Sequence, residues 1–182
     1  MTHARLPVVA SPHVTAPLVI LDIDGVLADV RHRLHYLSTR PKNWEGFFAA
    51  AKSDQVLEIG AEFAKRAAAT HEIVYLTGRP ERLRAATQAW LDHQLLPTGR
   101  LVMRSEGDRR PSAVVKLHEL RKLRRESTVE LLVDDDPSVI DAARAAGFTV
   151  QLADWMPRPA DPDLPLFGTD LLHDAQQREG RT

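Results

Sequence analysis

Two patterns of apolar and polar positions alternate along the chain. Short continuous apolar runs, typical of strands buried on both faces, are separated by stretches in which apolar residues recur every three or four positions, as on one face of a helix. The apolar runs occupy residues 17–22, 71–78, 99–103, 129–135 and 148–152. The helical stripes comprise Val56, Ile59, Phe63 and Ala67; Leu83, Ala86, Trp90 and Leu91; Val114, Leu117, Leu120 and Leu123; and Val139, Ile140, Ala143 and Ala146. This alternation predicts an α/β three-layer sandwich with a mainly parallel central sheet.

Three segments do not fit the alternation. Residues 1–17 contain three prolines and predict a flexible leader. Residues 26–55 follow the first strand and read as a small flap, or minimal cap, of a domain that spans residues 18–156. Residues 157–182 contain several prolines and then a polar end, so we expect a loosely attached, Pro-rich tail.

Composition narrows the class of protein. At 182 residues the chain is long enough for one domain with a substantial core. The formal net charge of −1 gives no global attraction to nucleic acid, so any such attraction needs a local patch. The sequence has no cysteine, which excludes disulfides, thiolate metal sites and cysteine nucleophiles. No apolar run approaches the roughly 18–20 residues of a membrane span and no signal peptide is recognisable, so we expect a cytoplasmic protein with no membrane partner.

Candidate chemistry gathers where the predicted strands end. Sites in open parallel sheets form at the carboxyl ends of the strands. The residues that this rule brings together are Asp22 and Asp24 after the first strand, Thr77, Gly78 and Arg79 after the second, and Asp134, Asp135 and Asp136 after the fourth, with Lys116 near the start of a helix. Acids from two strands repel one another unless a cation lies between them, and oxygen ligands of this kind suit Mg²⁺.

Phosphate chemistry would use such a cation. Thr77, the amide of Gly78 and Lys116 supply donors and positive charge for a phosphate group. A carboxylate nucleophile would divide the slow hydrolysis of a phosphate monoester into two easier steps through an aspartyl-phosphate. The attack of one anion on another needs neutralisation by the cation and by Lys116. A second acid would protonate the leaving oxygen and then activate water.

The motifs DIDGVLAD, LTGR and VDDD, together with Lys116, resemble in order the four motifs of the haloacid dehalogenase (HAD) superfamily of phosphohydrolases. The resemblance implies that Asp22 is the nucleophile and Asp24 the general acid/base. It also implies that Mg²⁺ is held by the Asp22 side chain, the Asp24 backbone carbonyl, and one or both of Asp134 and Asp135.

A narrower resemblance covers roughly residues 18–155. LVMRSEGDRRPSAVVK and LLVDDDPSVIDAARAAGFTVQLAD are similar to the corresponding stretches of the 3′-phosphatase domain of phage-type polynucleotide kinase/phosphatases. That resemblance implies functional roles for Arg33, Arg79 and Asp108. The sequence departs from those relatives in having no GxxxxGK[ST] phosphate loop for a kinase half. It also has Asp136 where they tend to have a basic side chain.

We therefore expect a Mg²⁺-dependent phosphomonoesterase that removes 3′-phosphates from polynucleotide ends, with a separately encoded kinase or ligase as a possible partner. A local basic rim could attract the nucleic acid; its candidates are Arg31, Arg33, Arg79, Arg104, Arg109 and Arg110. A small-molecule phosphatase acting on a nucleotide or sugar phosphate is the first alternative, and a catalytically idle binding module is the second. The flap aromatics Trp44, Phe47 and Phe48 form either a small core or a stacking surface for bases.

Overall fold

The computed structural model describes residues 16–156 and 170–179. The predicted leader, except for its last two residues, and the segment 157–169 lie outside the described residues. The strands of the central sheet are β1 (Leu18–Leu21), β4 (Glu72–Pro80), β5 (Gly99–Arg104), β6 (Val129–Asp134) and β7 (Val150–Leu152). They pair in the order β5-β4-β1-β6-β7, and every pairing is parallel. The predicted parallel sheet is therefore confirmed.

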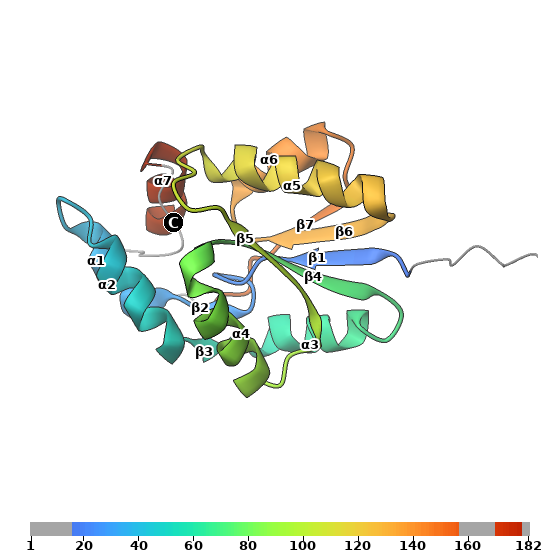
Figure 1. Ribbon diagram of the computed structural model, residues 1–182, viewed down its shortest axis with the longest axis horizontal. Coiled ribbons are helices and arrows are strands. Elements are labelled where there is room, and N and C mark those ends of the chain that lie inside the picture. Colours follow the sequence, from blue (N-terminus) through green and yellow to red (C-terminus); the bar gives the residue numbers. More distant parts are fainter. Residues whose placement is uncertain (1–15, 157–169, 180–182) are drawn as a thin grey trace, which may run out of the picture.

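Helices cover both faces of this sheet (Figure 1). On one face lie α3 (Glu58–Ala67) and α4 (Arg84–His93), and on the other lie α5 (Ser112–Glu126) and α6 (Pro137–Ala145). The first helical stripe was expected to include Val56, but α3 begins only at Glu58, and Val56 instead pairs with Ala28 in a separate two-stranded antiparallel sheet. Pro80 ends β4 (Glu72–Pro80). No helix among the described residues is both long and apolar enough to cross a membrane.

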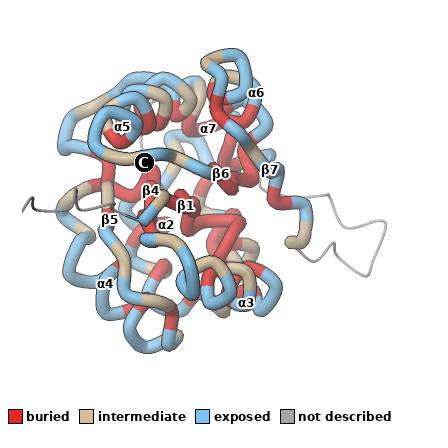
Figure 2. The backbone as a smooth tube through the Cα atoms, turned by 90° about the vertical axis from the view of Figure 1, so that its right-hand side faces the viewer, coloured by how far each residue is buried: buried red, intermediate tan, exposed pale blue. Residues whose placement is uncertain are grey.

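The strands contribute side chains to two apolar cores, one on each face, because successive side chains point to opposite sides of a sheet. Val19 and Leu21 of β1 pack with residues of α3 and α4, whereas Leu18 and Ile20 pack with residues of α5 and α6. Figure 2 shows the buried strands in the middle of the molecule and the mainly exposed outer surfaces of the helices. A continuous apolar run such as 18–21 is needed to fill both cores at once.

The segment between β1 and α3 forms a cap beside the carboxyl edge of the sheet (Figure 1). Its elements are β2 (Ala28–Asp29), a 3₁₀ turn (Arg31–Arg33), α1 (His35–Ser38), α2 (Trp44–Ala49), a second 3₁₀ turn (Ala50–Ser53) and β3 (Gln55–Val56), with β2 antiparallel to β3. Trp44, Phe47 and Phe48 pack on one another as the centre of this cap.

Helix α7 (Asp170–Glu179) differs from the expected loosely attached tail. Leu172 and Ala175 are fully buried and belong to the same apolar cluster as the cap residues. Lys42 and Trp44 of the cap each bond the Glu179 carboxylate. Residues 170–179 are therefore part of the packed structure, and only the segment 157–169 and residues 180–182 of the predicted tail lie outside the described residues.

Candidate active site

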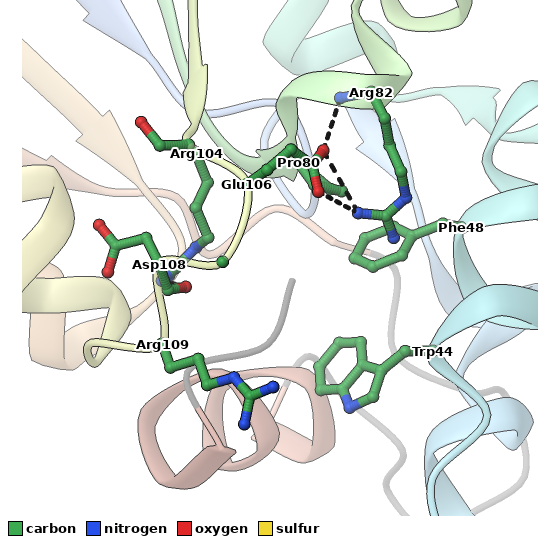
Figure 3. Close-up of a pocket in the computed structure, with 10 residues that line it drawn as sticks. Trp44, Phe48, Pro80, Arg82, Arg104, Glu106, Asp108 and Arg109 are labelled. Carbon is green, nitrogen blue, oxygen red and sulfur yellow. Dashed lines mark hydrogen bonds and ion pairs between the residues drawn. The ribbon is translucent and has the colours of Figure 1, made fainter.

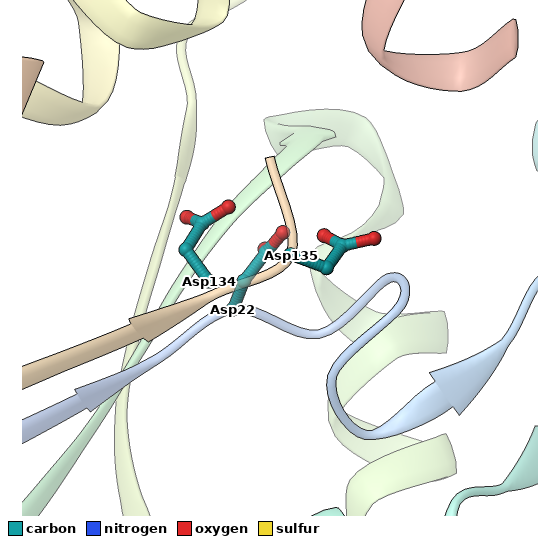
Figure 4. Close-up of side chains that lie close together, drawn as sticks. All are labelled: Asp22, Asp134 and Asp135. Atoms are coloured by element: carbon teal, nitrogen blue, oxygen red, sulfur yellow. The ribbon is translucent and has the colours of Figure 1, made fainter. Parts of the chain in front are cut away.

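Two neighbouring strands bring three carboxylates together. Asp22 directly follows β1, Asp134 ends β6, and Asp135 comes next. One oxygen from each side chain lies within 4.8 Å of the others. Figure 4 shows the three side chains close together at the ends of the two strands. All three residues are buried, with exposed fractions of 5%, 0% and 7%. Because burial weakens the screening between like charges, this group is unfavourable unless a cation lies close by.

Lys116 supplies one such cation. It lies in the second turn of α5, and its ammonium group is 2.8 Å from Asp22 Oδ2 and 2.7 Å from Asp134 Oδ2. Burial alone would lower the pKa of Lys116, but attraction to the two carboxylates outweighs burial and raises it. The lysine therefore remains charged and joins the acids of β1 and β6.

One lysine does not balance three acids. Burial raises the pKa of Asp22 well above its usual value; Lys116 opposes that rise, and Asp134 and Asp135 add to it. In addition, Asp22 Oδ1 is buried and has no hydrogen-bond partner among the described residues. An unpartnered carboxylate oxygen surrounded by two further acids fits a divalent oxygen-seeking cation such as Mg²⁺.

The turn after β1 permits this close packing only because residue 25 is glycine. Gly25 has φ +85°, a conformation that side-chain-bearing residues rarely adopt. A Cβ atom at this position would lie 1.8 Å from Oδ2 of Asp135. The DxDG sequence thus lets the backbone of the first motif approach the acid of the fourth.

Asp24 lies in a different electrostatic environment from Asp22. Its Oδ1 accepts hydrogen bonds from Arg33 Nη2 at 2.8 Å and from Arg79 Nε at 2.9 Å. Burial raises the pKa of Asp24, but the two guanidinium groups outweigh burial and lower it to about 2. The carboxylate of Asp24 is therefore ionised at neutral pH. It does not belong to the group formed by Asp22, Asp134 and Asp135.

Asp54 completes this second cluster, and the sequence analysis missed it. Its carboxylate accepts from Arg33 Nε and Nη2 at 2.8 Å each, and from Arg79 Nη2 at 2.8 Å. Arg33, Arg79, Asp24 and Asp54 are all buried and together carry two positive and two negative charges. No local sequence signal marks Asp54, which lies in the ordinary polar stretch KSDQ.

The remaining predicted residues lie at three places: the end of β4, the loop after β5 and the start of α6. Thr77 and Gly78 are buried at the end of β4, where the Thr77 hydroxyl accepts from the amide of Arg79 at 3.2 Å. Asp108 instead pairs with Arg110 beyond β5, and this hydrogen bond lowers its pKa to about 2. Asp136 caps α6 by accepting from the amide of Ser138 at 2.8 Å.

A pocket of about 250 Å³ lies between α2 and the loop after β5 (Figure 3). Its lining residues are Trp44, Phe48, Pro80, Arg82, Arg104, Ser105, Glu106, Gly107, Asp108 and Arg109. Trp44 and Arg109 point into it from opposite sides. Arg82 lies over the Phe48 ring and pairs with Glu106 at 3.1 Å.

The predicted basic rim is largely wrong. Arg33, Arg79 and Arg104 are buried, with exposed fractions of 0%, 2% and 3%. Two further arginines of the rim are held by aspartates two residues away: Arg31 by Asp29, and Arg110 by Asp108. Only Arg109 among the six is exposed and without an ion pair in the described part of the chain. The other five arginines are buried or paired within the fold, which the sequence pattern does not reveal.

The parallel sheet, the small cap and the acid–lysine cluster at the carboxyl edge define a phosphohydrolase of the haloacid dehalogenase type. The family model described as "Polynucleotide kinase PNKP phosphatase domain" matches residues 16–154. The chain therefore belongs to this family of phosphatase domains, as its four motifs predicted. No curated protein matches the sequence.

Solved structures with the same fold include the complex "Structure of the Pnkp1/Rnl/Hen1 RNA repair complex", with a TM-score of 0.66 at 23% identity. The match covers 83% of this chain but only 46% of that one, so this chain spans less than half of that larger protein. A putative phosphoglycolate phosphatase from Lactobacillus plantarum has a TM-score of 0.54 at 16% identity, covering 82% of this chain and 90% of its own. A haloacid dehalogenase-like hydrolase from Streptococcus pneumoniae has a TM-score of 0.52 at 10% identity, covering 75% and 84%.

Proposed function

We propose that this phosphatase domain is a Mg²⁺-dependent 3′-phosphatase of polynucleotide ends that works through a phosphorylated Asp22. The observation that carries the proposal is the state of Asp22: one oxygen is held by Lys116, and the other is buried beside Asp134 and Asp135 with no hydrogen-bond partner among the described residues. A nucleophile and a metal ligand both need a free carboxylate oxygen. The HAD fold and the family membership support the same assignment.

Asp22, Asp134 and Asp135 would hold Mg²⁺ through their side chains, and Asp24 through its backbone carbonyl, as the family resemblance implies. Bound there, the ion would neutralise charge on the phosphate and lower the pKa of Asp22 toward the ionised, nucleophilic form. This last effect matters because burial and the neighbouring acids push the pKa of Asp22 in the opposite direction.

The chemistry uses the chain's own groups in two displacements. An oxygen of Asp22 forms a bond to phosphorus, and the bond between phosphorus and the 3′ oxygen of the substrate breaks. The leaving oxygen takes a proton from Asp24, which then accepts a proton from the water that attacks phospho-Asp22 and releases inorganic phosphate. Lys116, the Thr77 hydroxyl and the amide of Gly78 would contact the non-bridging oxygens throughout.

Asp24 can donate that proton only if its surroundings change during the reaction. Two buried arginines hold it ionised in this structure. The phosphate of a bound substrate is the natural competitor for Arg79, which lies in the same TGR stretch as the phosphate-binding Thr77 and Gly78. Transfer of Arg79 from Asp24 to the phosphate would raise the pKa of Asp24 and make it a general acid.

Two features support a polynucleotide substrate: the family to which the domain belongs, and the pocket in which Trp44 faces the exposed Arg109. An apolar ring and a cation that has no ion pair among the described residues suit a base and a phosphate of the same strand. By analogy with the Pnkp1/Rnl/Hen1 complex, a separately encoded kinase or ligase would act on the same ends. The inward-facing arginines favour the alternative of a small nucleotide or sugar phosphate, since they leave little basic surface for a strand.

Phosphate release from matched substrates tests the proposal. The set comprises a 3′-phosphorylated oligonucleotide, its 5′-phosphorylated isomer, a 3′-mononucleotide, a 5′-mononucleotide and an aryl phosphate, each with Mg²⁺ and with the Asp22→Asn variant as control. We expect preference for the 3′-phosphorylated oligonucleotide and no release by the variant. Preference for a mononucleotide would keep the mechanism and reject the polynucleotide. Undiminished release by Asp22→Asn would reject Asp22 as the nucleophile.

A further inference from the structure

Helix α7 lies beside the acid cluster although it is outside the segment that matches the family, which ends at residue 154. Figure 1 places it between the cap and the helices on the α5–α6 face of the sheet. Its apolar residues Leu172 and Ala175 are buried with the cap core, at exposed fractions of 1% and 0%. Because these apolar side chains are removed from water, packing anchors the helix there.

The polar side of α7 faces the end of β6. His173 is buried, and its Nε2 lies 3.1 Å from Oδ2 of Asp135. One turn further along, Gln177 donates through Nε2 to Oδ2 of Asp136 at 2.9 Å. Two consecutive acids of the fourth motif therefore receive donors from a helix that the family core does not include.

We propose that α7 is a working part of the metal centre and that His173 is a positioning residue for Asp135. The inference rests on the proposed Mg²⁺ site. With Oδ2 held by the imidazole, the Asp135 side chain is fixed in rotation and its other oxygen is left for the cation. Hydrogen bonds to ligating carboxylates from such outer partners typically change metal affinity 10- to 100-fold when they are removed.

The geometry explains why the donor comes from outside the core. Asp134 is already fixed by Lys116 at 2.7 Å and by the amide of Asp136 at 3.0 Å. For Asp135, by contrast, the side-chain hydrogen bond within the described residues comes from His173. Without α7, the Asp135 carboxylate would be free to turn toward solvent, and each cation bound would have to order it again at an entropic cost.

Magnesium affinity measured without substrate tests this role. Isothermal titration calorimetry on the full chain would compare wild type with His173→Leu, which fills the buried space without a donor, and with His173→Gln, which retains one. The control is Arg178→Ala on the outer side of α7, where Arg178 is 76% exposed and pairs only with Asp174 in the described structure. A second readout is phosphate release as a function of Mg²⁺ concentration.

We expect His173→Leu to bind Mg²⁺ 10- to 100-fold more weakly, with His173→Gln intermediate and Arg178→Ala unchanged. Saturating Mg²⁺ should restore the turnover of His173→Leu, which a merely structural defect would not allow. Wild-type affinity in a folded His173→Leu protein, or tighter binding, would overturn the role. If His173→Leu fails to fold, His173→Ala, which also lacks a donor, takes its place, and wild-type affinity in a folded His173→Ala protein would overturn the role. Because binding is read without substrate, these outcomes are separate from the Asp22→Asn test of the phosphatase function.

Discussion

Arg33 and Asp54 are joined by two hydrogen bonds of 2.8 Å each, from Nε to Oδ1 and from Nη2 to Oδ2. The two residues lie near the beginning and the end of the cap, 21 residues apart, and both side chains are fully buried. This two-point pairing closes the cap into a loop and presents Arg33 to Asp24. Asp24 and the cap are therefore held by one network of charges.

Asp54→Asn should be strongly destabilising and should also impair catalysis. The substitution removes a buried negative charge that faces two buried arginines, and breaking a buried pair on one side typically costs about 3–5 kcal/mol. Arg33 and Arg79 would then shift, and their hydrogen bonds to Asp24 would change. Urea denaturation would measure the loss of unfolding free energy, and phosphate release below the unfolding range would measure the catalytic defect.

Asp29→Asn is the matched control for Asp54→Asn. Asp29 also pairs with an arginine of the cap, Arg31, but the Arg31 side chain is 36% exposed, whereas the side chains of Arg33 and Asp54 are fully buried. Surface pairs contribute about 0–1 kcal/mol, so this variant should remain close to wild type. Equal destabilisation by the two substitutions would contradict the view that Asp54 is the anchor of the cap.

Asp24 should make the protein sensitive to acid below about pH 4. Its pKa in the folded state is about 2, below the usual 3.8 expected for the unfolded chain. Since the folded value is depressed, the stabilisation is fully present above the unfolded pKa and is lost as pH falls through the folded one. Over this window wild type should lose about 2 kcal/mol more than Asp24→Asn. Urea denaturation between pH 5 and pH 2 measures both slopes, and parallel slopes would contradict the prediction.

Gly25→Ala should destabilise the protein and weaken its binding of Mg²⁺. A methyl group would lie 1.8 Å from Asp135 Oδ2, so either the turn or the acid must move. Gly147→Ala is a matched control, because Gly147 has φ +79° but no atom within 4 Å of the added Cβ. Both variants carry the backbone strain, which costs about 1–3 kcal/mol. Only Gly25→Ala should lower the affinity for Mg²⁺, which calorimetry measures. Similar affinities in the two variants would contradict the view that a side chain at residue 25 displaces Asp135.

The sheet and the acid cluster could be predicted from the sequence because their determinants are local. A strand buried on both faces needs a continuous apolar run, as in residues 18–21, and a parallel sheet collects whatever follows its strands at one edge. The proximity of Asp22 and Asp134 can therefore be predicted without knowing which side chains lie between them. The four motifs then led to the family, which the match over residues 16–154 confirms.

The features that the sequence did not reveal depend on long-range pairing. Asp54 looks like a solvated acid until the fold places it against Arg33 and Arg79, 21 and 25 residues away. Arginines that seemed to form a basic rim are neutralised within the fold. Helix α7 presents only a short apolar stripe after a proline-rich stretch, and its helical packing is decided by the cap it covers rather than by its own sequence.

Arg109→Ala should separate a polynucleotide substrate from a small one. Arg109 is exposed, faces Trp44 across the pocket and has no ion pair among the described residues, so it is available to a phosphate of the strand. We expect a several-fold higher KM for the 3′-phosphorylated oligonucleotide, an unchanged KM for an aryl phosphate, and a salt dependence of the oligonucleotide KM that is shallower by about one charge. Arg100→Ala is the control: Arg100 is near the opposite end of β5, is also exposed, and its loss changes the net charge equally. If both variants raise the oligonucleotide KM alike, the effect is one of net charge. If Arg109→Ala leaves it unchanged, the pocket does not bind the strand and the small-molecule alternative is favoured.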